Sequence, residues 1–272
     1  SPTNIGLYLV CALCAKDFGF IDSENLYARL DNTLTSIEKM KKWKGHLYNW
    51  YDTCSLSLLE PKYISSVDSG NFLACLIVLK EGVKQYIHEK TEFISVCRRI
   101  EKLFEETDLS AIYNKNTDRF LIGVPVDENG NAIVSGGNDY DMLMSEARTL
   151  SYIALAKREV PKKHWAKLSR PLVKKADRIG VASWTGTAFE YFMPALFLPT
   201  VKGSLMYEAL RFAFYCQRQR YALTDKGYKV WGISESGYFA FDSDMNYRYR
   251  AFGIPELGLK RGLENDLVIS PY

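Results

Sequence analysis

The sequence lacks the features that mark membrane, metal-binding and disulfide-rich proteins. Its longest apolar stretch, Ile5 to Ala15, is too short to span a bilayer. The CxxC pair formed by Cys11 and Cys14 has no second pair, and with only three histidines in the chain a zinc site is not expected. The six cysteines show no disulfide-framework spacing, so we expect reduced thiols, as in a cytoplasmic protein, and neither a metal nor another cofactor.

An excess of charge of one sign is also missing. Lys and Arg number 35 against 32 Asp and Glu, which leaves a net charge of +3 and argues against nucleic acid or an anionic membrane as the main partner. A hydrophobic content of 47% with 25% charged residues is typical of a soluble globular protein and excludes disorder and collagen. A chain of 272 residues can bury a sizeable core, and the size favours a single domain over residues 1–272.

What the sequence has in excess is aromatic side chains. They make up 14% of the residues, with eighteen Tyr, fourteen Phe and five Trp. Aromatic rings fill protein cores, and in clefts they also stack on flat apolar ligand faces, including those of sugars. The composition therefore leaves a carbohydrate-binding cleft open as one explanation.

Hydrophobic periodicity predicts an all-α protein whose helices are separated by aromatic, glycine-bearing loops. The expected helices run from Thr3 or Asn4 to about Lys16, from Ser23 to before Gly45, from Asp68 or Ser69 through Leu79, from Thr91 through Phe104, from Asp139 or Asp141 to about Lys157, and from Gly203 to about Leu223. A small hairpin is expected over residues 119–125 with a turn at 128–131, and strand-like segments over 180–191 and 228–241. There is no βαβ alternation and no short repeat, so the pattern favours a helical toroid with functional loops at the helix ends.

Glu146 is the first candidate for chemistry. On its expected helix the carboxyl projects from an apolar stripe that includes Met142 and Leu150, while Arg148 points elsewhere. Desolvation raises the pKa of a buried carboxyl, which suits a general acid working near neutral pH. The alternative is a structural glutamate satisfied by an arginine or by backbone amides.

Three further acidic residues stand in motifs rich in glycine, hydroxyl and aromatic side chains. Glu235 lies between two serines in Trp231-Gly-Ile-Ser-Glu-Ser-Gly-Tyr238, where hydroxyls could hold an ionised nucleophile or base; an exposed turn is the alternative. Glu190 has similar surroundings with more rings. Asp68 is explained most simply as a helix N-cap, and bonding to sugar hydroxyls is the rival explanation. Two buried carboxyls beside aromatic clefts are what a glycosidase needs, although spacing alone does not establish one.

Several longer motifs closely resemble the glucoamylase-like region of cyclic β-1,2-glucan synthases. The motifs occur in order along the whole chain: Gly45-His-Leu-Tyr-Asn-Trp-Tyr-Asp-Thr53, Pro61-Lys-Tyr-Ile-Ser-Ser-Val-Asp-Ser-Gly-Asn71, Ser145-Glu-Ala-Arg148, His164-Trp165, Ser183-Trp-Thr-Gly-Thr-Ala-Phe-Glu-Tyr-Phe-Met-Pro194, Trp231-Gly-Ile-Ser-Glu-Ser236, and Tyr249-Arg-Ala-Phe-Gly-Ile-Pro255 with Gly258-Leu-Lys-Arg261.

This resemblance implies an (α/α)6 barrel related to endo-β-1,2-glucanases, with short β-hairpins in its loops. Because the family's domain continues beyond the segment that matches Ser270-Pro-Tyr272, it implies that the barrel here is incomplete and that the chain is a fragment of a larger multidomain protein. The neighbouring domains would be a membrane-bound, nucleotide-sugar-using synthase and a phosphorylase-like module. The implied activity is transglycosylation that closes linear β-1,2-glucan into a ring on the cytoplasmic side of the membrane, with no membrane contact by this segment.

Carried over by position, the resemblance implies Glu146 as acid/base and Glu235 as nucleophile of a retaining double displacement, with Glu190 as a competing carboxylate. Retention requires carboxyl groups about 5–5.5 Å apart. The other matched positions would line the glucan groove together with Glu190: Trp50, Asp52, Asp68, Trp184 and Tyr191. Two alternatives stay open, which are endo-hydrolysis of β-1,2-glucan and a non-catalytic glucan-binding or scaffold fragment.

Overall fold

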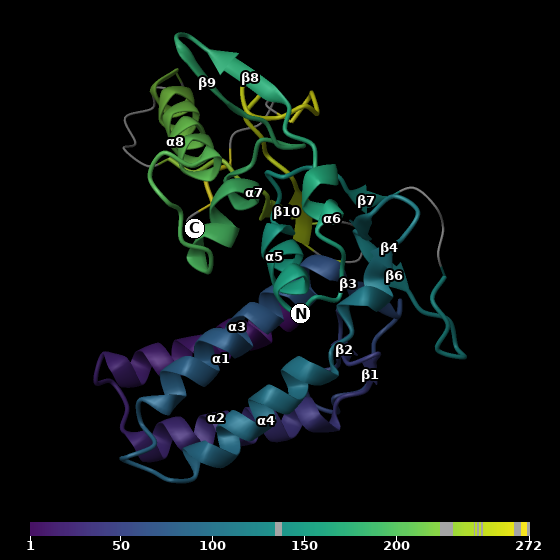
Figure 1. Cartoon of the computed structure of the whole chain (residues 1–272), viewed down its shortest axis with the longest axis vertical. Coiled ribbons are helices and arrows are strands. Elements are labelled where there is room, and N and C mark those ends of the chain that lie inside the picture. Colours follow the sequence, from purple (N-terminus) through teal and green to yellow (C-terminus); the bar gives the residue numbers. More distant parts are fainter. Residues whose placement is uncertain are drawn as a thin grey trace. The chain divides into compact units, whose positions relative to one another are not determined.

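Helices supply most of the secondary structure in the computed structural model of the chain (Figure 1). The structure describes residues 1–133, 138–223, 231–241, 243, 245, 247–263 and 268–270. The chain divides into two compact units. Unit 1 contains Ser1–Tyr140 and Thr149–His164, and unit 2 contains Asp141–Arg148 and Trp165–Tyr272.

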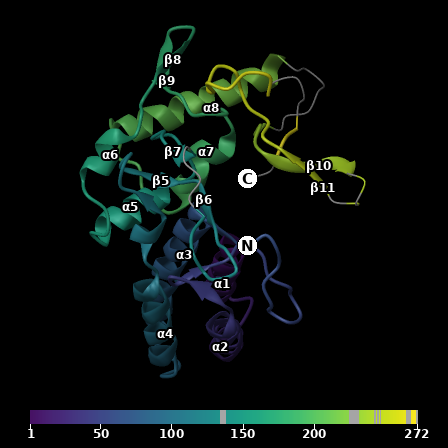
Figure 2. The ribbon, with the colours of Figure 1, turned by 90° about the vertical axis from the view of Figure 1, so that its right-hand side faces the viewer.

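Four long helices form the body of unit 1. They are α1 (Pro2–Asp17), α2 (Ser23–Lys39), α3 (Ser66–Lys84) and α4 (Phe93–Glu106). Helix α1 packs along α3 and α2 lies beside α4, so the four helices form two layers (Figures 1 and 2). The buried residues of α2 are Leu26, Leu30, Leu34 and Ile37, which recur at helical spacing as the sequence predicted.

The predicted positions of these helices are confirmed, but the caps expected at Ser23 and at Asp68 are wrong, and α1 already begins at Pro2, before the expected start at Thr3 or Asn4. Asp22, not Ser23, caps α2 by accepting a hydrogen bond from the Asn25 amide at 2.8 Å. Ser65 caps α3, and the backbone amide of Asp68 donates to its hydroxyl at 3.3 Å. Each cap is the last extended residue before the helix, and its side chain satisfies an amide that has no partner within the helix.

Short strands connect the helices of unit 1. The pairs are β1 (Lys42–Trp43) with β2 (His46–Leu47), β3 (Tyr63–Ser65) with β6 (Gly123–Pro125), and a three-stranded sheet of β4 (Tyr113–Asn114), β5 (Arg119–Leu121) and β7 (Asp139–Tyr140), all antiparallel; the 3₁₀ helix η1 (Leu109–Ile112) precedes β4. The predicted hairpin with its turn at residues 128–131 is confirmed, because Val126 forms an antiparallel bridge with Ala132 across the turn and β5 pairs with β7 beyond it.

The fifth predicted helix begins later than expected. Helix α5 spans Arg148–Ala156, while Asp139 and Tyr140 form β7 against Leu121 and Phe120. Backbone pairing between distant segments fixes these residues as strand, and sequence periodicity does not report such pairing. Glu146 consequently lies in the turn that precedes α5 and not on the helix.

Unit 2 is built around one long helix and two hairpins. Its elements are α6 (Lys163–Lys167, which begins in unit 1), β8 (Leu172–Lys175), β9 (Arg178–Val181), α7 (Ala188–Phe192), the 3₁₀ helix η2 (Met193–Leu196), α8 (Leu205–Leu223), β10 (Ser236–Phe241) and β11 (Tyr247–Arg250). Strands β8 and β9 pair, as do β10 and β11. The prediction of α8 is confirmed, whereas most of the segment expected as a strand over 180–191 forms loop and α7. The segment expected over 228–241 contains β10, and its residues 228–230 lie outside the described residues.

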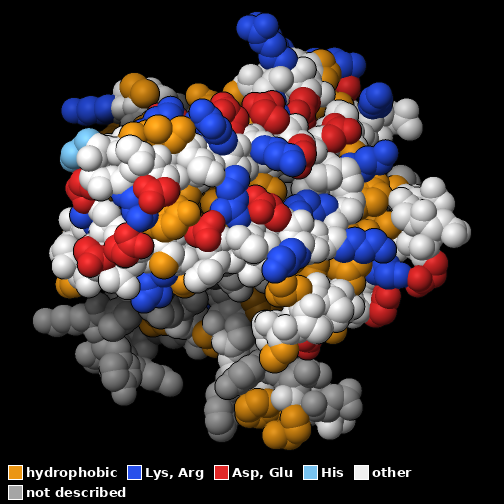
Figure 3. Space-filling model, turned by 90° about the horizontal axis from the view of Figure 1, so that it is seen from below, with side chains coloured by type: hydrophobic (Ala, Val, Ile, Leu, Met, Phe, Trp, Pro, Cys, Tyr) orange, Lys and Arg blue, Asp and Glu red, His pale blue; other side chains and the backbone are white. Residues whose placement is uncertain are grey.

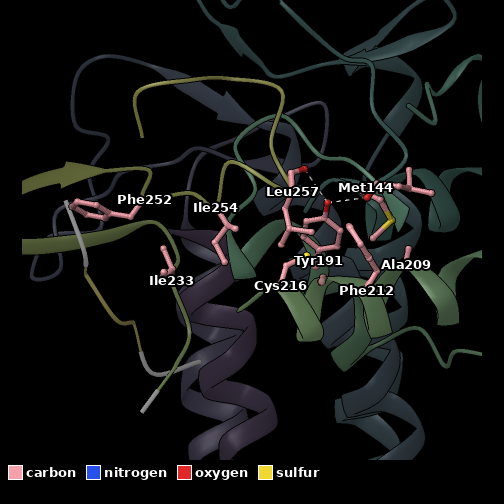
Figure 4. Packing of buried hydrophobic residues seen from close by; sticks show 11 residues of the cluster. Met144, Tyr191, Ala209, Phe212, Cys216, Ile233, Phe252, Ile254 and Leu257 are labelled. Atoms are coloured by element: carbon pink, nitrogen blue, oxygen red, sulfur yellow. Dashed lines mark hydrogen bonds between the residues drawn. The ribbon is translucent and has the colours of Figure 1, made fainter. Parts of the chain in front are cut away.

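The core of unit 2 forms where α8 meets α7 and the loop that follows β11. Ala209, Phe212 and Cys216 of α8 pack around Tyr191, with Leu257 beside them (Figure 4). The structure thus confirms a predominantly helical fold with short strands in the loops. An incomplete (α/α)6 barrel and a single domain over residues 1–272 stay predictions.

Charged side chains of both signs are interspersed over the face drawn in Figure 3. In unit 1, for example, the Arg99 guanidinium lies 2.5 Å from an Asp31 oxygen and 2.7 Å from a Glu38 oxygen. Such mixing agrees with the small net charge of the chain. Among the helices in the described ranges, none combines the length and the hydropathy that a membrane crossing requires.

Candidate active site

All three glutamates singled out from the sequence lie in unit 2. Glu146 belongs to its first segment, and Glu190 and Glu235 belong to its second. The fold therefore brings into one compact unit carboxylates that are far apart along the chain. Their surroundings differ, and the differences decide what each can do.

The turn that bears Glu146 is held by backbone pairing on its N-terminal side. Met142 forms a parallel bridge with Ser169, and the Leu143 amide donates to the Ser169 carbonyl at 2.9 Å. The Glu146 side chain is half-buried, and the Ser145 hydroxyl donates to its Oε2 at 3.3 Å. The carboxyl thus stands on a loop whose backbone is fixed, immediately before the first turn of α5.

Arg148 does not point away from this loop, in contrast to the prediction. Its side chain is buried, and its guanidinium donates to the carbonyls of Leu143 at 3.4 Å and Tyr191 at 3.2 Å. Burial lowers the pKa of Arg148 to about 10, which leaves it charged at neutral pH. Arg148 therefore links the Glu146 loop to the carboxyl end of α7.

Glu190 is a structural carboxylate in this fold. It is 5% exposed, and its Oε2 accepts from the hydroxyls of Ser183 at 2.7 Å and Thr185 at 2.6 Å and from the Thr187 amide at 3.1 Å. Its Oε1 accepts from the Thr185 amide at 3.1 Å, and with Thr187 it forms the capping box of α7. Both oxygens are therefore engaged in organising residues 183–187, and a role of Glu190 as a nucleophile or a groove residue stays a prediction.

Two glycines let this loop pack closely against the segment after β11. Gly186 has φ 76°, and a Cβ there would lie 2.5 Å from the Ile254 carbonyl oxygen. A Cβ on Gly253 would lie 1.8 Å from the Thr185 carbonyl oxygen. The position of the loop therefore depends on the absence of side chains at both residues.

The surroundings of Glu235 shift the pKa of its carboxyl. It is half-buried, and burial raises its pKa above the usual range; the nearby charge of Glu190 acts in the same direction. The Tyr249 hydroxyl donates to Oε2 at 2.6 Å and opposes this rise. The expectation that flanking serines hold the carboxylate is not supported, since the Ser234 hydroxyl accepts from the Phe189 amide and the Ser236 hydroxyl donates to the Gly237 carbonyl. Tyr249, on the paired strand, was missed because its contact depends on the β10–β11 register.

Trp184 presents an exposed but fixed ring in the same unit. The side chain is 48% exposed, and its indole N–H donates to Asp141 Oδ1 at 2.6 Å. Its backbone carbonyl accepts from the amides of Leu259 at 3.0 Å and Lys260 at 2.8 Å. A role of Trp184 in lining a glucan groove stays a prediction. The local sequence gives no sign that Asp141 is its partner, since the two residues are 43 positions apart.

Tyr191 does not line a groove. The residue is 0% exposed and belongs to the core of unit 2 (Figure 4). Its hydroxyl lies 2.8 Å from the Val181 carbonyl and 3.2 Å from the Leu257 carbonyl, and burial raises its pKa well above the usual range. The prediction for Tyr191 is corrected: it is a packing residue that ties α7 to two loops.

The remaining predicted binding residues lie in unit 1. Trp50 is 42% exposed and stacks on Tyr63 with ring centroids 6.0 Å apart. Asp52 Oδ1 accepts from the amides of Cys54 and Ser55, which lowers the pKa of Asp52 and shapes a tight turn. Asp68 accepts from the Thr3 amide at 3.2 Å. A role for these three residues in glucan binding stays a prediction.

Asp52 also lines a groove of about 600 Å³ within unit 1. Helix α1 contributes Asn4 and Tyr8, and helix α2 contributes Asn32 and Ser36. Polar residues one helical turn apart on α1 and on α2 are the sequence signal for this groove, which was not among the predicted sites.

Comparison with solved structures defines the fold class. The chain superposes on an endo-β-1,2-glucanase from Chitinophaga pinensis, solved with sophorotriose and glucose, with a TM-score of 0.71 and 15% identity over 95% of this chain and 65% of that one. An endo-β-1,2-glucanase from Talaromyces funiculosus, a mutant solved with β-1,2-glucan, gives a TM-score of 0.75 at 11% identity over 98% and 60% of the two chains. A putative glucoamylase from Bacteroides fragilis gives a TM-score of 0.72 at 16% identity, over 94% of this chain and 63% of that one. At these identities the likeness establishes the fold, which is that of endo-β-1,2-glucanases and glucoamylase-like proteins.

Among curated proteins, the chain is similar to the cyclic β-(1,2)-glucan synthase NdvB of Rhizobium meliloti (strain 1021). The two are 28% identical over an alignment of 393 residues, which covers the whole of this chain and 14% of the synthase. The resemblance inferred from the sequence motifs is thereby confirmed. A scan against family models found no match.

Proposed function

We propose that this chain is a carbohydrate-active domain that cleaves β-1,2-glucan with retention and transfers the cleaved chain to a sugar hydroxyl, so that a linear glucan is cyclised. The observation that carries the proposal is the arrangement in unit 2. Glu146 and Glu235 come from distant segments, and one compact unit holds both together with the exposed ring of Trp184. The similarity over the whole chain to a cyclic glucan synthase supports the choice of substrate.

The proposed reaction has two steps, each with balanced atoms. In the first, a Glu235 carboxylate oxygen forms a bond to the anomeric carbon while the bond from that carbon to the leaving oxygen breaks and Glu146 donates a proton to that oxygen. In the second, Glu146 takes a proton from the acceptor hydroxyl, whose oxygen bonds to the anomeric carbon and releases Glu235 as a carboxylate. Two inversions at the same carbon leave the configuration unchanged.

The environment of Glu235 suits a nucleophile at neutral pH. Burial raises its pKa and thereby increases the basicity of the carboxylate, and the Tyr249 hydroxyl stabilises the charged form. Glu190 is a weaker candidate because hydroxyl and amide donors already engage both of its oxygens.

Transfer and hydrolysis differ only in the acceptor of the second step. A sugar hydroxyl gives transfer, and water gives hydrolysis. A stacked sugar on an aromatic ring such as Trp184 would favour transfer by occupying the position of the attacking water.

Product analysis on linear β-1,2-glucan tests the proposal. The purified chain should yield rings, each lighter by one water than the linear glucan of equal length, and mass spectrometry distinguishes them. Glu146→Gln and Glu235→Gln should each lower the rate by about a thousandfold or more, since each removes a group required in both steps. Glu208→Gln is the matched control: this side chain of α8 is 53% exposed and forms a surface ion pair with Arg211 at 3.5 Å, so its loss should leave the rate unchanged. Near-normal rates in either site variant would reject that residue's role.

Two other candidate functions have a specific observation in their favour. Endo-hydrolysis is favoured by the fold shared with endo-β-1,2-glucanases, and shorter linear products without rings would establish it. A non-catalytic glucan-binding fragment is favoured because the chain spans 60–65% of these solved structures. Glucan binding without turnover, regained in a longer piece of the parent protein, would establish that function.

The proposal extends to the surroundings of the domain. We place it on the cytoplasmic side of a membrane-bound multidomain parent, next to a synthase domain and a phosphorylase-like domain. Neighbouring domains are proposed because the chain aligns with 14% of the synthase. The glucan made by the first neighbour would be the substrate here.

A further inference from the structure

We infer that Asp141 is a positioning residue that fixes the Trp184 ring as a stacking platform for a glucosyl unit, aligned with the loop that bears Glu146. The inference rests on the proposed function and adds a residue that neither the motifs nor the similarity to relatives assigns. It concerns only residues of unit 2.

The backbone of Trp184 is anchored on both sides of the residue. Its carbonyl accepts from the amides of Leu259 and Lys260, and the adjacent residues Ser183 and Thr185 both bind the buried Glu190 carboxylate. With the main chain fixed in this way, rotation of the side chain is the main freedom left to the ring.

Asp141 restrains that rotation. The indole Nε1 lies 2.6 Å from Asp141 Oδ1, a short distance typical of a hydrogen bond to a charged acceptor. The only polar atom of the indole is thereby satisfied, while 48% of the residue surface stays exposed. The exposed surface is therefore apolar ring, which fits the C–H face of a neutral sugar and offers no hydrogen bond to an anion.

Asp141 also belongs to the same loop as Glu146. Its backbone carbonyl accepts from the Ser169 amide at 2.6 Å, and the Leu143 amide donates to the Ser169 carbonyl at 2.9 Å. The ring and the proposed acid are thus tied to one loop five residues apart. A sugar stacked on Trp184 would keep a constant position relative to the Glu146 carboxyl, and reaction rates are sensitive to displacements of about 1 Å.

A purely structural role is the competing explanation, since the Asp141–Trp184 bond also joins two loops. Such a role predicts lower stability in every variant that loses the bond, with no specific effect on substrate. A positioning role predicts a rise in KM that depends on the Trp184 indole. The two explanations therefore differ in a double-mutant cycle.

The experiment compares wild type, Asp141→Ala, Asp141→Asn, Trp184→Phe and the double variant Asp141→Ala/Trp184→Phe on linear β-1,2-glucan. Asp141→Ala should raise KM about tenfold with a smaller change in kcat, because a freely rotating ring loses most of its stacking contribution. Asp141→Asn keeps an oxygen acceptor and should stay within about threefold of wild type. In the Trp184→Phe background, where no indole N–H exists, Asp141→Ala should change KM less than about twofold.

A second measurement detects the Asp141–Trp184 hydrogen bond independently of enzymatic activity. In a ¹⁵N–¹H spectrum of protein labelled at tryptophan, the indole resonance that disappears in Trp184→Phe should shift in Asp141→Ala and be largely retained in Asp141→Asn. Thermal unfolding of the same variants shows whether each folds.

The outcomes distinguish failure of the positioning role of Asp141 from failure of the proposed function. If wild type converts glucan and Trp184→Phe raises KM but Asp141→Ala does not, or if Asp141→Ala acts equally in both backgrounds, the positioning role is overturned while the proposed function stands. If wild type neither binds nor converts glucan although the indole resonance reports the bond, the proposed function fails and this role fails with it.

Discussion

Replacement of Tyr249 by Phe is expected to shift the pH dependence of glucan conversion. The Tyr249 hydroxyl donates to Glu235 Oε2 at 2.6 Å and lowers a pKa that burial and the charge of Glu190 raise. Without this donor the pKa of Glu235 rises further. Because a nucleophile must be ionised, the acidic limb of kcat/KM should then move to higher pH.

The magnitude follows from the loss of the hydrogen bond from Tyr249 to Glu235. A hydrogen bond to a charged group contributes about 1.5–3 kcal/mol, and one pKa unit corresponds to about 1.4 kcal/mol. Solvent reaching the half-buried Glu235 reduces the effect, so we expect a shift of about one pH unit. Above this shifted limb, the rate should approach that of wild type.

The assay measures initial rates of conversion of linear β-1,2-glucan between acidic and neutral pH. The pH dependence of kcat/KM is followed, because it reports the pKa values of the protein without bound glucan. Tyr238→Phe is the matched control, because Tyr238 also lies on the β10–β11 hairpin but packs its ring edge-on against Phe252 at 5.4 Å. An unchanged acidic limb in Tyr249→Phe would refute the reasoning. Movement of the basic limb instead would mean that Glu235 acts in its protonated form and that the roles of Glu235 and Glu146 are exchanged.

Two further predictions concern stability. Gly253→Ala should destabilise the protein by about 2 kcal/mol or more and reduce activity, because the new Cβ would meet the Thr185 carbonyl oxygen at 1.8 Å. Gly237→Ala is the control, because no atom lies within 4 Å of a Cβ at that position. Equal melting temperatures for the two variants would contradict the packing argument. Burial lowers the pKa of His46 to about 4. Below pH 6.5 the unfolded chain therefore takes up a proton that the folded chain excludes. As the pH drops from about 6.5 to about 4, the free energy of unfolding should fall by up to about 3 kcal/mol. Denaturant titrations should show a smaller fall in His46→Gln and an unchanged fall in His88→Gln, whose side chain is 75% exposed; an undiminished fall in His46→Gln would count against burial of the neutral ring.

The sequence predicted the long helices well, because their patterns are local. The buried positions of α2 recur at helical spacing, and those of α4, including Phe93 and Ile100, do the same. The prediction failed where distant strands decide the structure. Asp139 reads as the start of a helix, but it pairs with Leu121 as part of β7, and this displaces the beginning of α5 to Arg148.

The candidate site was predicted in part, for a similar reason. The residue types and their local surroundings suggested Glu146 as an acid and Glu235 as a nucleophile or base, and the family resemblance suggested Trp184 as a groove residue; these roles stay predictions. The contacts that set their properties come from residues 43 and 14 positions away along the chain, Asp141 for Trp184 and Tyr249 for Glu235. The wrong expectation for Tyr191 has a related cause, since an aromatic ring beside a glutamate is equally consistent with a cleft residue and with a core residue.

The configuration of the bond formed at the anomeric carbon tests the central claim most directly. Proton NMR during conversion of linear β-1,2-glucan by this chain reports it, whether the acceptor is a sugar hydroxyl or water. Double displacement through Glu235 and Glu146 predicts that the newly formed bond is β from the first time point. An α product, or no conversion at all, would contradict the account.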